Sequence, residues 1–459
     1  MQTTSEKLSV KEKVGYALGD TAANFIFQTM VMFQLAFYTD TFGITAAAAG
    51  TLLVVVRVWD AIFDPMMGIA ADRTKTKWGK FRPWILWTAV PFGIMGFLAF
   101  VTPDFSASGK LVYAYITYIV LMMVYSANNL PYSALSGVMT GDLGERTSLS
   151  SYRFVFAMLA QLIIQGLALP MVSYFGAGNS ALGYRYTMAI FSSLAVVLFF
   201  ITFSTTKERI QPDPAQKASV RQHFGDLTRN GPWLAMFALT LILFITLAMR
   251  GSVVFYYFKY YMHVDNYASL FSIFNVLGTT STIIGIFFSK GLSTRFGKRN
   301  VFIGGLLGTT LFTALFVFLP PTAVTLIFGM EMARQFVYGF TIPLLWAMMA
   351  DVADYSEWKN KRRATGIIFS AIVFALKAGL GFGGAITGFV LSLYGYVPNL
   401  AQQSDFALNG IVMTMSIFPA ITFGLCVVCL FFYSINKKAE IQITNELTER
   451  RKGFAPQAV

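Results

Sequence analysis

Apolar runs of roughly 20 residues, the length that crosses a bilayer as a helix, recur from one end of the chain to the other. Inside lipid every backbone polar group must be satisfied within the chain, so runs of this kind cross as α-helices. The sequence therefore predicts an all-α polytopic membrane protein with twelve transmembrane helices. The predicted spans are 14–39, 44–71, 84–102, 111–140, 151–176, 184–205, 232–261, 266–289, 300–319, 322–350, 366–394 and 409–434.

Composition excludes several other classes of protein. The 459 residues are 56% hydrophobic and 12% charged, which leaves too little polar surface for a soluble fold. The polar first residues, MQTTSEKLSVKEK, lack the short apolar core of a cleavable signal peptide. The short loops hold no Ser/His/Asp set, metal cluster or phosphate-binding glycine loop, so neither an enzyme nor a metal site is expected. Cys426 and Cys429 lie in an apolar segment and are expected to be small core residues.

The distribution of positive charge predicts the orientation of the chain. Of 35 Lys and Arg residues, 28 fall in the two tails and within or at the edge of alternate connections, whereas the opposite connections hold only Lys110, Arg185 and Lys259. By the positive-inside rule both termini are cytoplasmic. The net charge of +13 thus reports topology rather than nucleic-acid binding. We expect a plasma-membrane protein, or an inner-membrane one in a Gram-negative cell, with the bilayer as its surroundings and no obligate protein partner.

An internal repeat divides the spans into six and six. The step Gly-Lys occurs at 79–80 and again at 297–298, an offset of 218, and Arg146 and Arg363 are 217 apart. Basic turns could arise from topology alone, but the matched offset favours two six-helix bundles related by a pseudo-two-fold axis. The predicted domains are an N-terminal bundle with the cation site (1–205), a cytoplasmic linker (206–230), a C-terminal bundle (231–434) and a cytoplasmic tail (435–459).

Three charged residues interrupt the second predicted span, in the stretch RVWDAIFDP. Arg57, Asp60 and Asp64 stand at i, i+3 and i+7 and therefore share one helix face. Each carboxylate costs about 3 kcal/mol at the centre of a bilayer, and a bound cation would offset that cost. Na⁺ prefers oxygen ligands, and a proton would also serve because close carboxylates raise one another's pKa. Arg57 could simply neutralise Asp60, but one arginine can neutralise only one of the two carboxylates.

Other polar residues within spans are candidates for binding a polar substrate. Asp20 can accept hydrogen bonds from sugar hydroxyls, or it could balance Lys377. Arg250 could meet a substrate carboxylate or pair with another helix, and Glu331 with Arg334 is expected to form an intrahelical pair. The only histidines, His223 and His263, lie in or beside connections, so proton coupling would have to use carboxylates.

Acidic and basic residues are interleaved at the cytoplasmic ends of several spans. Salt bridges among them could close the inner side of a transporter and break when it inverts, although a solvated basic face is the alternative. The candidates for this cytoplasmic gate are Asp72, Arg73, Asp142, Arg146, Asp351, Asp354 and Arg363.

Five motifs in order carry a family resemblance over essentially the whole chain. RVWDAIFDP, RTKTKWGKFRPW, NLPYSAL, WAMMADVADYSEW and the lysine at 377 together resemble the glycoside–pentoside–hexuronide:cation symporters of the major facilitator superfamily. The resemblance implies that Asp60, Asp64 and the hydroxyl of Ser126 bind the coupling cation.

The resemblance also implies a sugar site. Asn129 takes the place of the sugar-binding aspartate of melibiose permeases, and Arg153, Trp346 and Lys377 match positions around the sugar. Trp346 could equally be a packing residue. Two departures stand out: Phe63 replaces an asparagine, which leaves H⁺ and Na⁺ both open, and Ser133 replaces a tryptophan, which disfavours galactosides.

The expected function is secondary active symport of a glycoside, pentoside or hexuronide with H⁺ or Na⁺ by alternating access, with no cofactor. A proton-coupled exporter of small molecules on the same fold is the alternative, although the polar in-span residues suit it less well. A channel is disfavoured because paired carboxylates and a two-half repeat fit alternating access.

Overall fold

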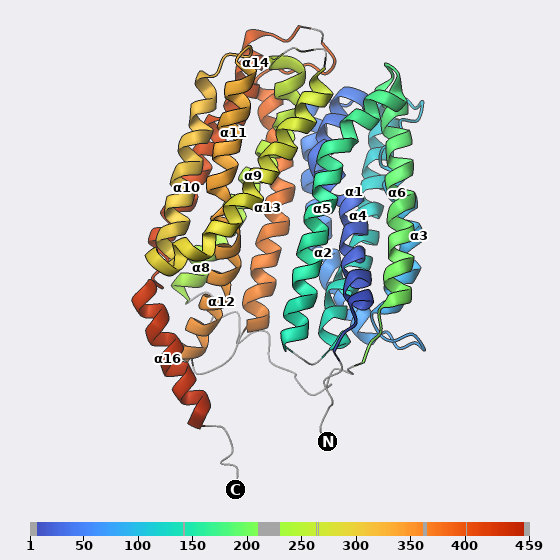
Figure 1. Ribbon diagram of the computed structural model, residues 1–459. Coiled ribbons are helices and arrows are strands. Elements are labelled where there is room, and N and C mark those ends of the chain that lie inside the picture. Colours follow the sequence, from blue (N-terminus) through green and yellow to red (C-terminus); the bar gives the residue numbers. More distant parts are fainter. Residues whose placement is uncertain are drawn as a thin grey trace. The chain divides into compact units, whose positions relative to one another are not determined.

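The computed structural model describes residues 7–140, 143–209, 230–262, 264, 266–360, 365–400 and 402–453 (Figure 1). Within these ranges every named element is a helix, and β contact is limited to an isolated bridge between Thr76 and Gly79. The all-α prediction is confirmed for this part of the chain.

Contacts divide the chain into two compact units. Unit 1 comprises 1–216 with the short segments 265–273 and 391–403, and unit 2 comprises 217–264, 274–390 and 404–459. Most of the predicted linker, 210–229, lies outside the described residues. The first six spans supply α1 (Val10–Ala36), η1 (Phe37–Phe42), α2 (Ala46–Arg73), α3 (Arg82–Leu98), α4 (Ala107–Met139), α5 (Leu143–Gly176) and α6 (Ser180–Thr205).

The second half supplies the remaining helices. They are α8 (Gly231–Tyr256), η2 (Tyr257–Tyr261), α9 (Tyr267–Phe296), α10 (Lys298–Leu315), η3 (Phe316–Phe318), α11 (Val324–Gly339), α12 (Thr341–Asn360), α13 (Thr365–Leu393), α14 (Asp405–Met415), α15 (Ile417–Phe431) and α16 (Lys437–Gly453). Each of the twelve predicted spans overlaps one or more of these helices.

Ten segments of the described chain are long and apolar enough to cross a membrane. Helices α1 and α3 occupy the other two predicted spans. Helix α3 has 17 residues, and α1 begins with charged residues and carries Asp20 in its interior. Ten membrane-spanning helices are therefore established by length and composition, and twelve remains a prediction.

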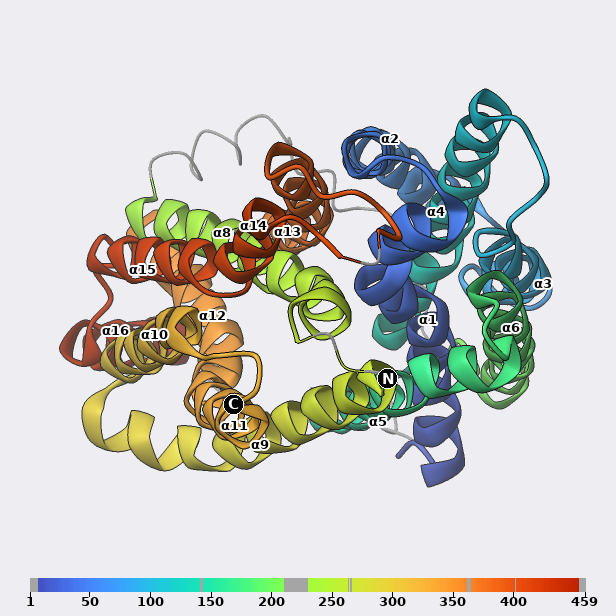
Figure 2. The ribbon, with the colours of Figure 1, turned by 90° about the horizontal axis from the view of Figure 1, so that it is seen from above.

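The two halves repeat the same helix packing. In the first half α6 packs against α1 and α3, and α3 packs against α4. In the second half α15 packs in the same way against α8 and α10, and α10 against α11. Figure 2 shows α1 beside α5 and α6 in unit 1. The first helix of each half also ends in a π-helical segment, η1 after α1 and η2 after α8.

Helix starts follow from local sequence. Ser9, Thr45, Ser106, Asn230 and Ser404 each precede a helix and accept a hydrogen bond from a backbone N–H of its first turn. Such caps satisfy donors that would otherwise lack partners at the helix end. Ser9 and Glu12 form a reciprocal capping box at the start of α1.

Glycines allow close helix packing in unit 2. Helix α13 presents Gly379 and Gly383 to α8, where an added Cβ would lie 2.7 Å from the Leu241 carbonyl oxygen and 2.4 Å from that of Ile245. Membrane helices associate through small residues of this kind because lipid gives apolar side chains no advantage in pairing.

The two Gly-Lys turns identified in the sequence have the same backbone requirement. Gly79 has φ +110° and Gly297 has φ +84°, the left-handed region that favours glycine. After Gly79, the Glu208 carboxylate accepts backbone N–H bonds from Lys80, Phe81 and Arg82 at 2.7–2.8 Å, which caps the start of α3. Glu208, which follows α6 at the end of the first half, thus anchors the Gly79–Lys80 turn.

Helix α2 is apolar on its outside and charged on its inside. Val55, Val58, Ile62, Met66 and Ile69 are exposed and recur at helical spacing, as expected of a lipid-facing stripe. Arg57 and Asp60 are 8% and 4% exposed. The charged stripe of the sequence therefore faces the interior of unit 1.

Candidate functional site

Asp60 lies at the centre of a buried polar cluster in unit 1. The Ser126 hydroxyl, from α4, donates to one Asp60 carboxylate oxygen at 2.9 Å, and an Arg57 guanidinium nitrogen lies 3.6 Å from the other. Asp64 is half-buried one turn further along the same face of α2. The structure therefore brings together three of the four residues of the predicted cation site, namely Arg57, Asp60 and Ser126.

Prolines loosen both helices that carry this cluster. Pro65 follows Asp64 in α2, and Pro131 lies five residues after Ser126 in α4. A proline has no N–H, so the carbonyls four residues earlier, at Ala61 and Ala127, lose their helical donors. Carbonyl oxygens without a donor are further potential cation ligands beside the carboxylates.

A second ion pair lies in unit 1 between α1 and α5. Arg153 donates to an Asp20 carboxylate oxygen at 3.1 Å, and its guanidinium lies 5.3 Å from the ring centre of Tyr132. Tyr132 stacks on Tyr16 with ring centres 4.6 Å apart. Asp20 is buried, whereas about a third (31%) of the Arg153 side chain is accessible. Two residues predicted to meet substrate are thus direct partners beside a buried aromatic pair.

The neighbouring asparagines of α4 have different environments. Asn129, the residue matched to the family's sugar-binding aspartate, is half-buried. Asn128 is 2% exposed and donates to the Thr88 hydroxyl of α3 at 2.8 Å. Sequence reasoning missed Asn128, although the side-by-side asparagines ahead of Pro131 were a signal that one of them would tie α4 to another helix.

Asp40 is a second residue that sequence reasoning missed. It lies in the π-helical segment η1, is 8% exposed, and accepts a hydrogen bond from the adjacent Thr39 hydroxyl at 2.9 Å. Tyr396 and Asn399, in the segment 391–403 that belongs to unit 1, also donate to Asp40, to its carboxylate and its backbone carbonyl respectively. Asp40 stands one residue past the predicted end of span 1, outside the in-span polar residues considered from the sequence.

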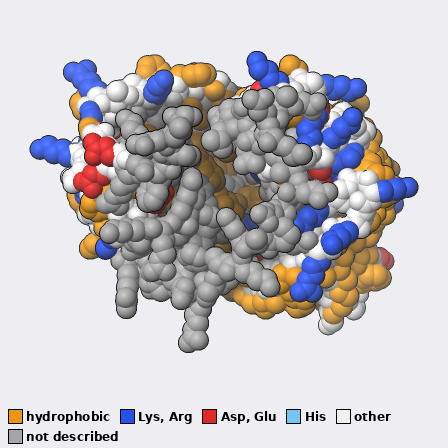
Figure 3. All heavy atoms as spheres, turned by 90° about the horizontal axis from the view of Figure 1, so that it is seen from below, with side chains coloured by type: hydrophobic (Ala, Val, Ile, Leu, Met, Phe, Trp, Pro, Cys, Tyr) orange, Lys and Arg blue, Asp and Glu red, His pale blue; other side chains and the backbone are white. Residues whose placement is uncertain are grey.

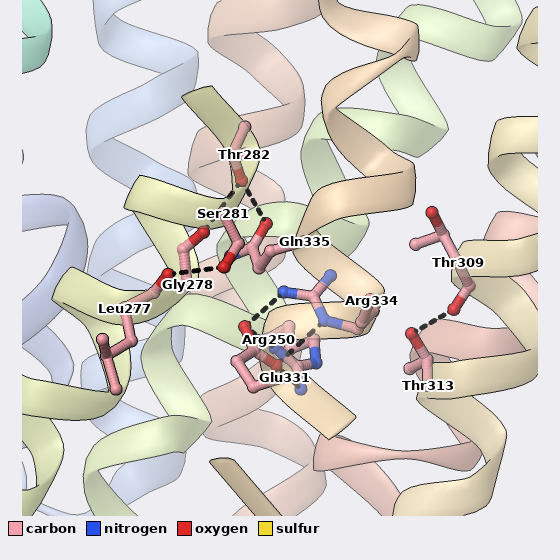
Figure 4. Close-up of polar contacts among 10 residues, drawn as sticks. All are labelled: Arg250, Leu277, Gly278, Ser281, Thr282, Thr309, Thr313, Glu331, Arg334 and Gln335. Atoms are coloured by element: carbon pink, nitrogen blue, oxygen red, sulfur yellow. Dashed lines mark hydrogen bonds and ion pairs between the residues drawn. The ribbon is translucent and has the colours of Figure 1, made fainter. Parts of the chain in front are cut away.

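In unit 2, Arg250 takes part in a buried three-residue cluster (Figure 4). Its two terminal nitrogens donate to the Glu331 carboxylate at 3.2 and 2.7 Å, and Arg334 donates to the same carboxylate at 3.0 and 2.6 Å. Arg250, Glu331 and Arg334 are 4%, 2% and 2% exposed. The predicted Glu331–Arg334 pair is confirmed, and Arg250 adopts the alternative of pairing with another helix.

The other two predicted substrate-binding residues of unit 2 are half-buried. Trp346, in α12, packs against the apolar core of the unit, which fits the packing alternative. Lys377 lies in the middle of α13.

Only part of the predicted cytoplasmic gate is described. Asp351 accepts hydrogen bonds from Lys298 at 2.7 Å, and Lys298 also lies 3.1 Å from Glu440 of α16. Asp354 is half-buried and Arg73 is exposed. Asp142 and Arg363 lie outside the described residues, as do the side chains of Asp72 and Arg146. Lys298 belongs to the second Gly-Lys turn, so the repeat itself was the signal for this partner.

A polytopic helical chain that buries ion pairs within its helical units defines a membrane transporter. Comparison with known proteins then identifies the family. A family model described as "MFS/sugar transport protein" matches residues 15–437. The chain belongs to this family, and within it to the glycoside–pentoside–hexuronide:cation symporters; it is a multi-pass protein of the inner membrane and a transporter rather than an enzyme.

Characterised and named relatives cover nearly the full length. The chain is 36% identical to the inner membrane symporter YicJ of Escherichia coli over 98% of this chain and 97% of the relative. It is 38% identical to the isoprimeverose transporter of Lactiplantibacillus pentosus over 93% and 89%. A solved structure of a bacterial homologue of the human lysosomal transporter Spinster matches with a TM-score of 0.72 at 14% identity, covering 95% of this chain and 99% of that one, and so supports the fold.

Proposed function

We propose that this protein is a secondary active symporter that imports a glycoside, pentoside or hexuronide together with H⁺ or Na⁺ by alternating access. The observation that carries the proposal is the buried cluster of Asp60, Arg57 and Ser126 with Asp64 one turn away. Two carboxylates on neighbouring turns of α2 and the Ser126 hydroxyl provide the oxygen ligands that a monovalent cation prefers.

The 3.6 Å contact between Arg57 and Asp60 is long for a salt bridge, and it favours an exchangeable role for the cation. A tight bidentate pair would neutralise Asp60 permanently. A loose pair lets an incoming H⁺ or Na⁺ compete for the carboxylate oxygens, with the Ser126 hydroxyl turning its oxygen toward Na⁺ or keeping its donor toward a carboxylate. Binding of the cation removes the charge that otherwise opposes movement of this region through the low-dielectric interior.

The sugar is assigned to the polar and aromatic groups around Asp20 and Arg153. A carboxylate can accept two hydroxyl hydrogen bonds and a guanidinium can donate several, and the buried Tyr132 ring supports the Arg153 guanidinium from below. Asn129 of unit 1 is a further proposed contact with the substrate, and the binding roles of Trp346 and Lys377 in unit 2 stay predictions from the sequence.

The proposed topology has twelve membrane helices and cytoplasmic termini. Seen from below (Figure 3), the described surface carries many Lys and Arg side chains and few Asp and Glu, as expected of a cytoplasmic face. We assign Lys298, Asp351 and Glu440, with the predicted gate residues, to closure of this side.

Uptake into proteoliposomes tests the proposal. A galactoside, a xyloside and a glucuronide are each offered under an imposed Na⁺ gradient and, separately, an H⁺ gradient. We expect accumulation of one sugar class under one gradient. Asp64→Asn should abolish gradient-driven accumulation while sugar affinity changes by less than about tenfold, because the sugar groups lie on other helices.

Asp104→Asn is the matched control, since Asp104 is an exposed aspartate of the same unit. Normal accumulation by Asp64→Asn would refute the coupling role. Export of sugar from the vesicles toward a higher external sugar concentration, driven by protons that enter, would instead identify the exporter.

A further inference from the structure

The lipid-facing stripe of α2 ends in a basic residue. The exposed apolar side chains of this stripe run to Met66 and Ile69, and Arg73, at the next helical interval, is also exposed. The apolar span of α2 ends at Ala71. Arg73 therefore lies where the hydrocarbon layer meets the polar headgroups of the bilayer.

The stretch from Arg73 to Arg82, here called the basic turn, joins α2 to α3. It contains five Lys and Arg residues and no Asp or Glu. Lys75 and Lys77 are exposed, and neither has a carboxylate partner within the part of the chain that the structure describes. Basic side chains at this depth attract the anionic headgroups of a leaflet.

Two exposed tryptophans accompany the basic turn. Trp78 lies within it, and the Lys77 ammonium is 5.0 Å from the centre of the Trp78 ring. Trp87 begins the exposed stripe of α3, which continues at Val90 and Ile94. Exposed tryptophan is typical of the membrane interface, because its ring contacts apolar chains while its N–H reaches polar groups.

The backbone of the basic turn is held in place by hydrogen bonds. Thr76 and Gly79 exchange backbone bonds of 3.2 and 3.3 Å, and the Thr76 hydroxyl accepts from the Trp78 N–H at 3.1 Å. Trp84 Nε1 donates to the Thr74 hydroxyl at 3.0 Å and so ties the start of α3 to the end of α2. A site that is ordered before its ligand arrives loses less entropy on binding.

The corresponding turn of the second half uses its cations within the protein. Lys298 donates to Asp351 and contacts Glu440, and Arg299 donates to two backbone carbonyl oxygens of α15. The two turns thus share a left-handed glycine but differ in what their basic side chains contact. The first turn presents its lysines to the surroundings of the protein.

We propose that the basic turn binds the headgroup phosphate of an anionic phospholipid, such as phosphatidylglycerol, through Lys75 and Lys77. The acyl chains of this lipid lie along the exposed apolar stripes that end at the turn, and these stripes favour a lipid over a soluble phosphate. The inference goes beyond sugar–cation symport and does not depend on which substrate is carried.

Quenching of tryptophan fluorescence by brominated lipids tests the inference. Purified full-length protein is reconstituted in phosphatidylcholine nanodiscs with rising fractions of brominated phosphatidylglycerol or, separately, of brominated phosphatidylcholine. The part of the quenching that Trp78→Phe removes reports lipid at the basic turn. There the wild type should prefer the anionic lipid by about tenfold or more, the contribution of two lysines at the membrane surface.

Lys75→Gln/Lys77→Gln should remove most of the preference reported by Trp78. Lys77→Gln alone should lower it about fivefold, which keeps the test valid if the double variant does not fold. Lys7→Gln/Lys11→Gln is the matched control, because it removes two exposed lysines from the same unit and should keep the preference of the wild type. Soluble glycerol phosphate, which has no acyl chains, should not displace the brominated lipid.

Four results would overturn the inference. Equal quenching by the two lipids in the wild type would refute it, as would a preference that survives Lys75→Gln/Lys77→Gln. An equal loss of preference in Lys7→Gln/Lys11→Gln would assign the effect to the overall charge of the protein. Displacement of the lipid by glycerol phosphate would assign the basic turn to a soluble phosphate.

Discussion

The two units bury charge of opposite sign. In unit 1 the buried charged side chains are Asp20, Asp40, Asp60 and Arg57, whereas in unit 2 they are Arg250, Arg334 and Glu331, counted over the described residues. Carboxylates therefore exceed arginines in one unit, and arginines exceed carboxylates in the other. Among the described residues, unit 1 therefore has an excess of buried negative charge and unit 2 an excess of buried positive charge.

The geometry of the two clusters differs as much as their sign. Glu331 receives four hydrogen bonds of 2.6–3.2 Å from two arginines. Asp60 receives one hydrogen bond of 2.9 Å from Ser126 and a 3.6 Å contact from Arg57. Charge-assisted hydrogen bonds of this length bind Glu331 to its two arginines more tightly than the 3.6 Å contact binds Asp60 to Arg57.

Neutralising one carboxylate in each unit should destabilise the two units by unequal amounts, and this is the largest expected effect. Glu331→Gln leaves two buried guanidinium groups without a countercharge and should lower stability by about 3–5 kcal/mol. Asp60→Asn keeps an acceptor for the Ser126 hydroxyl and removes only the longer 3.6 Å contact with Arg57, so it should cost less, about 1–3 kcal/mol. Thermal unfolding of the purified variants measures both. Similar losses in the two variants would show that the clusters do not differ in kind.

The anchors of the two Gly-Lys turns provide a second comparison. Glu208→Ala leaves three backbone N–H groups at the start of α3 without their acceptor and should cost about 1–3 kcal/mol. Glu440→Ala removes a partly exposed ion pair with Lys298 and should cost at most about 1 kcal/mol. The same thermal assay compares them. An equal cost would mean that α16 anchors its turn as firmly as Glu208 does.

Ser126→Ala sharpens the assignment of unit 1 to the cation. It removes the hydroxyl 2.9 Å from Asp60 and should weaken activation of uptake by the coupling cation about tenfold, or about 1.4 kcal/mol. Thr282→Val, which removes a 3.0 Å hydrogen bond to Gln335 in unit 2, serves as the control and should leave cation activation unchanged. Equal shifts in both variants would contradict a cation site confined to unit 1.

The smallest expected effect concerns the start of α1. Burial raises the pKa of Glu12, but its hydrogen bonds with Arg209 and Ser9 outweigh burial and hold the pKa below its ordinary value of 4.5. Because the pKa is lowered on folding, the stabilisation is present at neutral pH and is lost as the pH falls below about 4.5 through the folded-state value.

Glu12→Gln should therefore cost about 0.5–1 kcal/mol at pH 7. The difference from wild type should shrink as the pH approaches 4. Thermal unfolding at pH 7 and pH 4 tests this, and a difference that grows on acidification would contradict the assigned contacts.

Much of unit 1 was predictable because its signals are local. The charged face of α2 follows from spacing alone, and Ser126 followed from the family resemblance. Asp40 was missed because η1 extends helical structure past the end of the apolar run. The helix α16 lies within the predicted tail, and its Ile443 and Leu447 contribute to the core of unit 2, although its mean character is polar.

The sequence by itself determined the helical class, the positions of the helices and which face of α2 carries charge, since backbone satisfaction in lipid and the 3.6-residue period act over a few turns. The tertiary structure decided which charges meet. Arg153 pairs with Asp20 across 133 residues, and Arg250 pairs with Glu331 across 81. Periodicity orients a side chain relative to its own helix axis, but its partner depends on how distant helices pack against one another.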